Sequence, residues 1–300
     1  MTNYKQKQMA QEWTGKTFGN GWMHRHLVTM LKIVDIRILY VFSAIFIVPV
    51  CLAVRPSRGI IYRYFRQRHG YGRLRSAWKT YTNHCLFAQV VLDKFAMYAG
   101  RRFRTKLVGY ENFLRLAAQP EGFIQLSAHV GNYEIAGYTL VAETKTFNAL
   151  VYAGEKATVM DNRSKMFERN NLRMIAIRPD MSHLFEIDSA LRRGETVSMP
   201  ADRINGSPKY IELDLLGAKA RFPKGPFSVA TMRGLDVLAV NTMKTSTLEY
   251  TVCVTPLHYD KTAPRARQTE ELAEAYVAEL ESIMRRYPVQ WYNYFDFWAK

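Results

Sequence analysis

The sequence predicts an α/β fold in which a central, mostly parallel sheet is flanked by helices, with a membrane-associated helical region at the N-terminus. Beyond residue 100, short apolar runs alternate with helical periodicity, which is typical of strand-helix-strand units. Before residue 100, a long uncharged stretch stands among basic residues. The 300 residues are 48% apolar, which is enough for one full core and a smaller appended region. We therefore expect two parts, residues 1–99 and residues 100–300.

The first part is expected to hold a membrane-associated helix at about residues 33–54, together with amphipathic helices. Residues 38–54 carry no charge, and these 17 residues are at the short limit for a membrane-spanning helix. Basic residues lie on both sides of the stretch, so both of its ends look cytoplasmic. A re-entrant or in-plane helix, bent at Pro49, therefore fits better than a full span. The alternative is a buried core helix of a soluble protein.

Positive charge is concentrated in the N-terminal third. Residues 1–106 contain 19 Lys or Arg and three acidic residues, whereas residues 107–300 contain 23 of each kind. Eight of the basic residues lie between Arg55 and Lys79, where the sequence has no acid. This asymmetry favours an acidic partner, which is an anionic membrane surface, an acidic carrier protein or nucleic acid. No recognised nucleic-acid module accompanies the charge, so we expect no nucleic-acid partner.

The order of elements follows from the apolar runs. A long helix is expected over residues 73–99. Strands are expected at residues 103–108, 123–127, 147–152, 174–177, 195–199, 210–216, 236–243 and 249–257. Helices are expected at residues 132–142, 157–171, 181–193, 226–233 and 269–287. This alternation predicts parallel strands joined by helical crossovers.

His129 is the first candidate for chemistry, because it falls at the C-terminal end of the expected strand 123–127. Ligands of open α/β sheets usually bind at that edge. Glu134 falls in the first turn of the next expected helix, from which its carboxylate can fold back onto one imidazole nitrogen. The pair would then act as an oriented general base. The alternative is a loop-capping histidine beside a first-turn acid that the helix dipole favours.

Three further stretches combine special backbone residues with charge. Asp202 and Arg203 follow an expected strand and turn. Gly225 lies in a rigid Pro-Lys-Gly-Pro turn that opens a helix, where backbone N–H groups can approach a phosphate or an oxyanion. Arg163, on an expected helix, is a candidate for binding an acidic headgroup or a cofactor phosphate. Each stretch also has a purely structural explanation, as a turn cap, a stiff loop or a solvated face.

Four motifs occur together in one order. They are Ser127-Ala-His129-Val-Gly-Asn132-Tyr-Glu134, then Gly-Glu-Thr-Val followed by Asp202, then Phe222-Pro-Lys-Gly225-Pro-Phe, and an aromatic tail from Tyr287 to Trp298. Over residues 100–300, this combination resembles the bacterial lipid A late acyltransferase family of the lysophospholipid acyltransferase superfamily. The basic N-terminal region with its apolar helix is similar to that family as well.

The resemblance implies a membrane-associated enzyme that transfers a fatty acyl group from acyl carrier protein, or a coenzyme A thioester, to a lipid acceptor. It implies that His129 is the catalytic base and Glu134 its partner, and that residues 100–300 form the catalytic domain. Asp202 matches the acid of the second motif, and Asn132, Arg163, Asp202, Arg203 and Gly225 are the expected substrate-binding residues. We expect no cofactor beyond the thioester co-substrate, and a location at the cytoplasmic face of the cell inner membrane, peripheral or re-entrant.

Two departures bear on the acceptor. The sequence has Ala128 before the histidine and Pro-Lys-Gly-Pro-Phe in the later motif, unlike glycerol-phosphate acyltransferases, and Tyr133 stands where the lipid A enzymes usually carry Trp. A lipid A precursor is therefore one candidate acceptor among glycolipids, and a lysophospholipid or amino-acid lipid is the alternative. The reactive group is a hydroxyl or an amine, and no Gly-x-Ser-x-Gly elbow suggests an acyl-enzyme.

Two other kinds of protein remain as alternatives. One is a metal-dependent hydrolase, which the sequence disfavours because it has no His-Glu-x-x-His motif and its three cysteines have no zinc spacing. The other is a non-enzymatic membrane-surface binding protein, which the basic N-terminal region alone would suggest.

Overall fold

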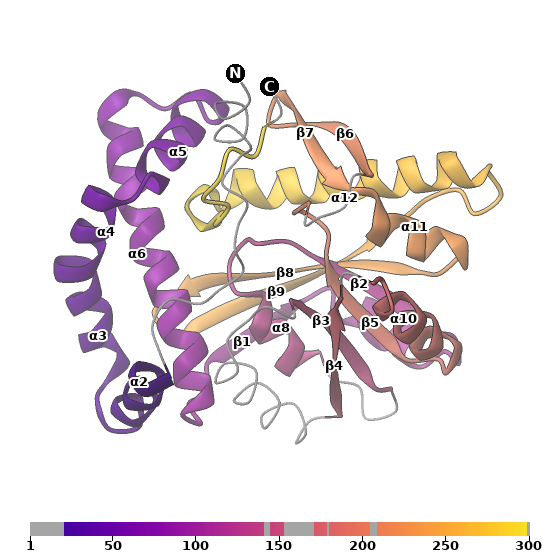
Figure 1. Cartoon of the computed structure of the whole chain (residues 1–300), viewed down its shortest axis with the longest axis horizontal. Coiled ribbons are helices and arrows are strands. Elements are labelled where there is room, and N and C mark those ends of the chain that lie inside the picture. The colour runs from indigo at the N-terminus through magenta and orange to yellow at the C-terminus, as the bar shows by residue number, and fades with distance from the viewer. Residues whose placement is uncertain (1–20, 141–144, 153–170, 179, 205–208, 299–300) are drawn as a thin grey trace.

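The computed structural model describes residues 21–140, 145–152, 171–178, 180–204 and 209–298, and its main feature is a seven-stranded sheet (Figure 1). The strands follow the order β1-β9-β8-β2-β5-β3-β4. Their bounds are β1 Arg104–Val108, β2 Phe123–Ser127, β3 Phe147–Tyr152, β4 Leu172–Ile177, β5 Thr196–Pro200, β8 Val237–Ser246 and β9 Glu249–Leu257. Every neighbouring pair is parallel except β8 and β9, which form an antiparallel hairpin. The predicted α/β class with a mostly parallel sheet is confirmed.

Helices cover both faces of this sheet. On one face, α10 His183–Arg192, α11 Lys224–Met232 and α12 Arg265–Arg286 pack over the side chains of Ile124 and Leu126. On the other face, α7 Tyr110–Ala117 and α8 Tyr133–Thr139 pack over Phe123. Strand β2 is consequently buried along its whole length, which explains its continuous apolar run. The polar groups that follow β2 therefore emerge from a rigid centre.

Two elements lie outside the expected pattern. Helix α7 was not predicted, and the run predicted as one strand at 210–216 continues into a hairpin of β6 Tyr210–Leu215 and β7 Ala218–Pro223. Its two turn residues, Leu216 and Gly217, both have positive φ, as a type I′ hairpin turn requires. The sequence signal for β7 was weak because Lys219 and Arg221 interrupt it and Phe222 is its only large apolar side chain. The predicted helix at 157–171 lies outside the described residues, apart from Asn171.

The N-terminal region forms helices that pack along one side of the sheet (Figure 1). They are α2 Gly21–Ile33, α3 Ile36–Phe42, the π-helical η1 Ser43–Ile47, α4 Val48–Val54, α5 Ser57–Arg63, the π-helical η2 Tyr64–Arg68 and the long α6 Arg73–Tyr98. The segment Ile36–Val54 is apolar and long enough to cross a membrane by length and composition. Only 22% of its apolar window is buried, so most of this surface faces outward.

The π-helical turn η1 leaves the Ala44 carbonyl without a hydrogen bond inside the helix. The Val48 N–H, which an α-helix would bond to Ala44, donates to the Ser43 carbonyl. The residue five positions after Ala44 is Pro49, which has no N–H. The Tyr81 hydroxyl of α6 donates to the Ala44 carbonyl at 3.0 Å instead. The irregular turn is thereby fixed against α6.

A buried polar cluster joins these helices to the sheet. Asp93 of α6 is fully buried and pairs with Lys244 of β8. The hydroxyls of Tyr40 of α3 and Tyr250 of β9 also donate to the Asp93 carboxylate. The carboxylate is thus surrounded by donors, as a buried charge requires. Any movement of α3 and α6 away from the sheet would leave charged groups unpaired.

The C-terminal segment lies beside the end of β2. After α12 comes the short η3 Pro288–Gln290, and Trp291 then bridges to Val130 in antiparallel fashion. Asn83 of α6 donates to the carbonyls of Val289 and Trp291. The segment therefore fills the space between α6 and the loop that follows β2.

Candidate functional site

The loop after β2 is held in one conformation by its neighbours. Gly131 has a φ of +55°, and its N–H donates to the Gln290 carbonyl at 2.8 Å. A Cβ at this position would lie 1.9 Å from the Thr242 carbonyl oxygen, so only glycine fits. The next residue, Asn132, donates its N–H to that same oxygen at 2.8 Å. The loop is therefore fastened to β8 on one side and to the C-terminal segment on the other.

His129 of this loop is paired with Asp202. The Nδ1 atom donates to Asp202 Oδ1 at 2.7 Å, and the His129 backbone N–H donates to Oδ2 at 2.9 Å. Strand register explains the meeting, because Ser127 is paired with Pro200 and each of the two residues follows its strand end by two positions. The pair lies at the C-terminal edge of the parallel strands, where the sequence predicted the site.

The surroundings keep the carboxylate charged and the imidazole neutral. Burial raises the pKa of Asp202, but the nearby His129 and Arg203 and the hydrogen bonds that it accepts lower that pKa well below its usual value. Burial lowers the pKa of His129, an effect that Asp202 opposes and Arg203 supports. A neutral imidazole that donates from Nδ1 has its lone pair on Nε2. The His129 side chain remains 13% exposed, so it can be reached from outside.

Glu134 is held by two side chains of α6. Its carboxylate pairs with Lys94 at 2.8 Å and accepts from the Tyr98 hydroxyl at 3.2 Å. Lys94 and Tyr98 are four residues apart on α6, so they present both donors on one helix face. Nδ1 of the imidazole is bonded to Asp202, so the predicted contact of Glu134 with one imidazole nitrogen does not involve Nδ1. Whether Glu134 takes part in the reaction stays a prediction.

The other predicted residues fall in several places. Asn132 is buried, and its side chain donates to the Tyr250 hydroxyl at 3.4 Å. Arg203 is half-buried beside Asp202, and its guanidinium binds the C-terminal segment. Gly225 is exposed in the first turn of α11, with nothing within 4 Å of the position of its Cβ. Arg163 lies outside the described residues.

Asn293 belongs to the same constellation and was not predicted. Its side chain is fully buried and donates to Asp202 Oδ2 at 3.0 Å. The sequence offered one signal, which is a small amide between two tyrosines of the C-terminal tail. A buried polar side chain needs a partner, but the chain offers many candidates. Nothing in the sequence names Asp202, which is 91 residues away, as that partner.

No group of three or more His, Cys, Asp or Glu side chains suited to a metal ion occurs among the described residues.

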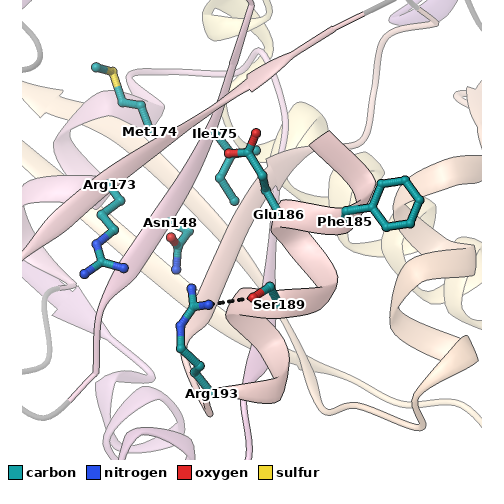
Figure 2. Close-up of a pocket in the computed structure, with 8 residues that line it drawn as sticks. All are labelled: Asn148, Arg173, Met174, Ile175, Phe185, Glu186, Ser189 and Arg193. Carbon is teal, nitrogen blue, oxygen red and sulfur yellow. Dashed lines mark hydrogen bonds between the residues drawn. The ribbon is translucent and has the colours of Figure 1, made fainter. Parts of the chain in front are cut away.

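One pocket of about 340 Å³ lies between β3, β4 and α10 (Figure 2). Asn148 and Arg173 are each the second residue of their strands, so this pocket is at the N-terminal edge of the sheet. It lies at the opposite edge of the sheet from His129 and contains no predicted site residue.

A comparison with protein families decides the class of this protein. The model of a family described as bacterial lipid A biosynthesis acyltransferase matches residues 93–298. The chain belongs to this family. The match includes His129, Asp202 and Asn293, and it confirms the resemblance seen in the motifs. The protein is therefore an acyltransferase of lipid biosynthesis. The family and the apolar segment Ile36–Val54 together indicate that this acyltransferase associates with a membrane.

Other comparisons add little. No curated protein matches the sequence of this acyltransferase. Among solved structures, the 1-acyl-sn-glycerophosphate (LPA) acyltransferase PlsC from Thermotoga maritima superposes with a TM-score of 0.40 and 15% identity, covering 87% of this chain and 97% of that chain.

Proposed function

We propose that this acyltransferase transfers a fatty acyl group from a thioester, of acyl carrier protein or of coenzyme A, to a hydroxyl or amine of a lipid acceptor, with His129 as general base. The observation that carries this proposal is the hydrogen bond of 2.7 Å between His129 and Asp202 at the edge of the sheet. In a family of acyltransferases, a neutral, oriented imidazole at this edge is suited to remove the acceptor's proton. Glycolipids such as a lipid A precursor are the proposed acceptors.

The proposed reaction needs no acyl-enzyme. The acceptor hydroxyl gives its proton to Nε2 of His129 as its oxygen attacks the thioester carbonyl. Asp202 stabilises the imidazolium that forms, because its carboxylate is already ionised and bonded to Nδ1. Collapse of the tetrahedral intermediate breaks the carbon–sulfur bond, and the imidazolium protonates the leaving thiolate. The products are the acylated lipid and the free thiol, and the histidine is neutral again.

The location of the reaction is proposed to be the cytoplasmic face of the inner membrane. Outward-facing apolar side chains along α3, η1 and α4 give a surface for the bilayer, and they are Ile38, Val41, Phe42, Ile45, Phe46, Ile47, Val50 and Val54. Eight basic residues follow between Arg55 and Lys79, each worth about 1 kcal/mol near anionic headgroups. The same positive charge favours encounter with an acidic carrier protein.

A reconstituted assay tests the proposal. Purified enzyme in vesicles would receive acyl carrier protein or coenzyme A carrying a labelled acyl chain, with a lipid A precursor, a lysophospholipid or an amino-acid lipid as acceptor. Mass spectrometry of the lipids then identifies the product. We expect His129→Ala to lower turnover by about 10²- to 10⁴-fold. The matched control is His258→Ala, at an exposed position after β9.

Two results would overturn the proposal. The first is near-normal turnover by His129→Ala in a folded protein. The second is thioester consumption without any acylated lipid, which would indicate hydrolysis rather than transfer.

A further inference from the structure

We infer that Asn293 is a positioning residue, which Arg203 holds in the one orientation that fixes the Asp202 carboxylate against His129. This inference rests on the proposed role of His129. It assigns to the C-terminal segment a part in catalysis, in addition to its packing against α6.

The first step is the set of bonds on Asp202. Oδ1 accepts from His129 Nδ1, while Oδ2 accepts from the His129 backbone N–H and from Asn293 Nδ2 at 3.0 Å. The two bonds from His129 alone would let the carboxylate move together with the loop. Asn293 is the third donor and comes from a different part of the chain. The position of the Asp202 carboxylate is therefore fixed by the C-terminal segment as well as by the histidine loop.

The second step concerns the direction of the Asn293 amide. An amide has a donor end and an acceptor end, and rotating it by half a turn would place its oxygen against the Asp202 carboxylate. Arg203 Nε donates to Asn293 Oδ1 at 2.5 Å. An arginine only donates and a carboxylate only accepts, so this order of partners allows one amide orientation. Arg203 thereby ensures that Asn293 presents its N–H to Asp202.

The third step is that backbone hydrogen bonds connect the same residues. The Tyr292 N–H donates to the His129 carbonyl at 3.0 Å, and Arg203 Nη2 donates to the Tyr292 carbonyl at 3.0 Å. These two hydrogen bonds join His129, the C-terminal segment and Arg203 to one another. Since Asn293 is fully buried, water cannot easily replace its hydrogen bond. Loss of this amide should misplace Asp202 rather than merely loosen the surface.

A double-mutant cycle in kcat tests the inference. Asn293→Leu removes both hydrogen bonds at similar volume and is expected to lower kcat by about 10²-fold with little change in KM. In a background of Asp202→Asn, the same substitution is expected to cost less than about threefold, because its target is already gone. Asn148→Leu is the matched control, since Asn148 is also buried and bonds to Glu195, at the far edge of the sheet. We expect it to lower the melting temperature and leave kcat unchanged.

The Arg203 variants separate positioning from substrate binding. Arg203→Gln removes a positive charge that lowers the pKa of His129, so the acid limb of the kcat/KM profile should move to higher pH. Arg203→Lys keeps the charge and one donor nitrogen, so its kcat should be much closer to that of the wild type. A rise in KM alone, with an unmoved pH profile, would mean that Arg203 only binds substrate.

The outcomes distinguish this inference from the proposed function. If Asp202→Asn itself leaves kcat unchanged, the proposed histidine mechanism fails. If Asp202→Asn lowers kcat but the loss from Asn293→Leu is absent, or is equally large in both backgrounds, only the positioning role fails. Circular dichroism and melting curves of each variant establish that the compared proteins are folded.

Discussion

Asp202 holds both the side chain and the backbone of His129, with Oδ1 at 2.7 Å from Nδ1 and Oδ2 at 2.9 Å from the backbone nitrogen. One carboxylate thus controls the ring tautomer and the path of the loop at once. The strands that precede the two residues, β2 and β5, are paired in register. Inserting or deleting one residue between β2 and His129, or between β5 and Asp202, would therefore separate the two side chains.

The roles of Asp202 and Glu134 can be told apart by the pH profile of kcat/KM. The charge of Asp202 raises the pKa of His129, so Asp202→Asn should move the acid limb of kcat/KM to lower pH while lowering kcat by about 10²- to 10⁴-fold. Glu134→Gln weakens the ion pair with Lys94 instead and should leave the limb in place. A shift of the limb in Glu134→Gln would return the orienting role to Glu134.

The wild-type pH dependence follows from the buried imidazole. The neutral form is the active base, and burial lowers the pKa of His129 below its ordinary value of 6.5. Activity should therefore persist to below pH 6.5 and then fall as the ring takes up a proton. Measuring kcat/KM between about pH 4 and pH 9 checks this, with lipid and vesicle composition held constant. An acid limb with an apparent pKa clearly above 6.5 would contradict it.

Gly131→Ala should lower the activity of the enzyme more than Gly217→Ala does. A methyl group at this position would overlap the Thr242 carbonyl, whereas Gly217 has a φ of +75° and open space around it. Both substitutions force an alanine into the left-handed region, which costs about 1–2 kcal/mol. Only Gly131→Ala must also displace the loop, so kcat should fall by about 10²-fold in this variant alone. Equal activity of the two variants would show that the loop accommodates the methyl group.

The buried ion pair between Asp93 and Lys244 should respond asymmetrically to mutation. Lys244→Met leaves the Asp93 carboxylate buried without its cation and should destabilise the protein by about 3–5 kcal/mol. Adding Asp93→Asn should recover part of that loss, since no buried charge is then left. Thermal or denaturant unfolding of both variants gives the comparison. Additive losses in the double variant would show that the two residues act independently.

Membrane binding should depend on the outer surface of the N-terminal helices. Phe46 is 58% exposed on η1, and Phe46→Asp should weaken sedimentation with anionic vesicles by at least about 10-fold, because burial of such a ring contributes about 1.5–3 kcal/mol. Phe185→Asp is the matched control on α10, where the ring is 81% exposed. High salt should weaken the remaining binding. Identical effects of the two variants would argue against this surface.

The sequence predicted the sheet and the position of His129 because those features follow from local patterns. Alternating apolar runs marked the strands, and the end of β2 marked the edge at which the histidine lies. The partner of the histidine depends on which strands are neighbours, and spacing along the chain favoured Glu134 although β5 brings Asp202 closer. Asn293 was beyond prediction for the same reason, since its contact with Asp202 joins residues 91 positions apart. The contacts of Asp202 with His129 and Asn293 depend on how distant parts of the chain pack together, which the composition of the sequence does not show.

The cluster of Tyr40, Asp93, Lys244 and Tyr250 has a geometric consequence for the substrate. It fixes the apolar helices to the same strands that support the histidine loop, through Tyr250 and Asn132. When those helices rest on a bilayer, the imidazole stands at one set height above the acyl chains. Lipids would then be selected by how far their nucleophile rises from the membrane as well as by its chemistry.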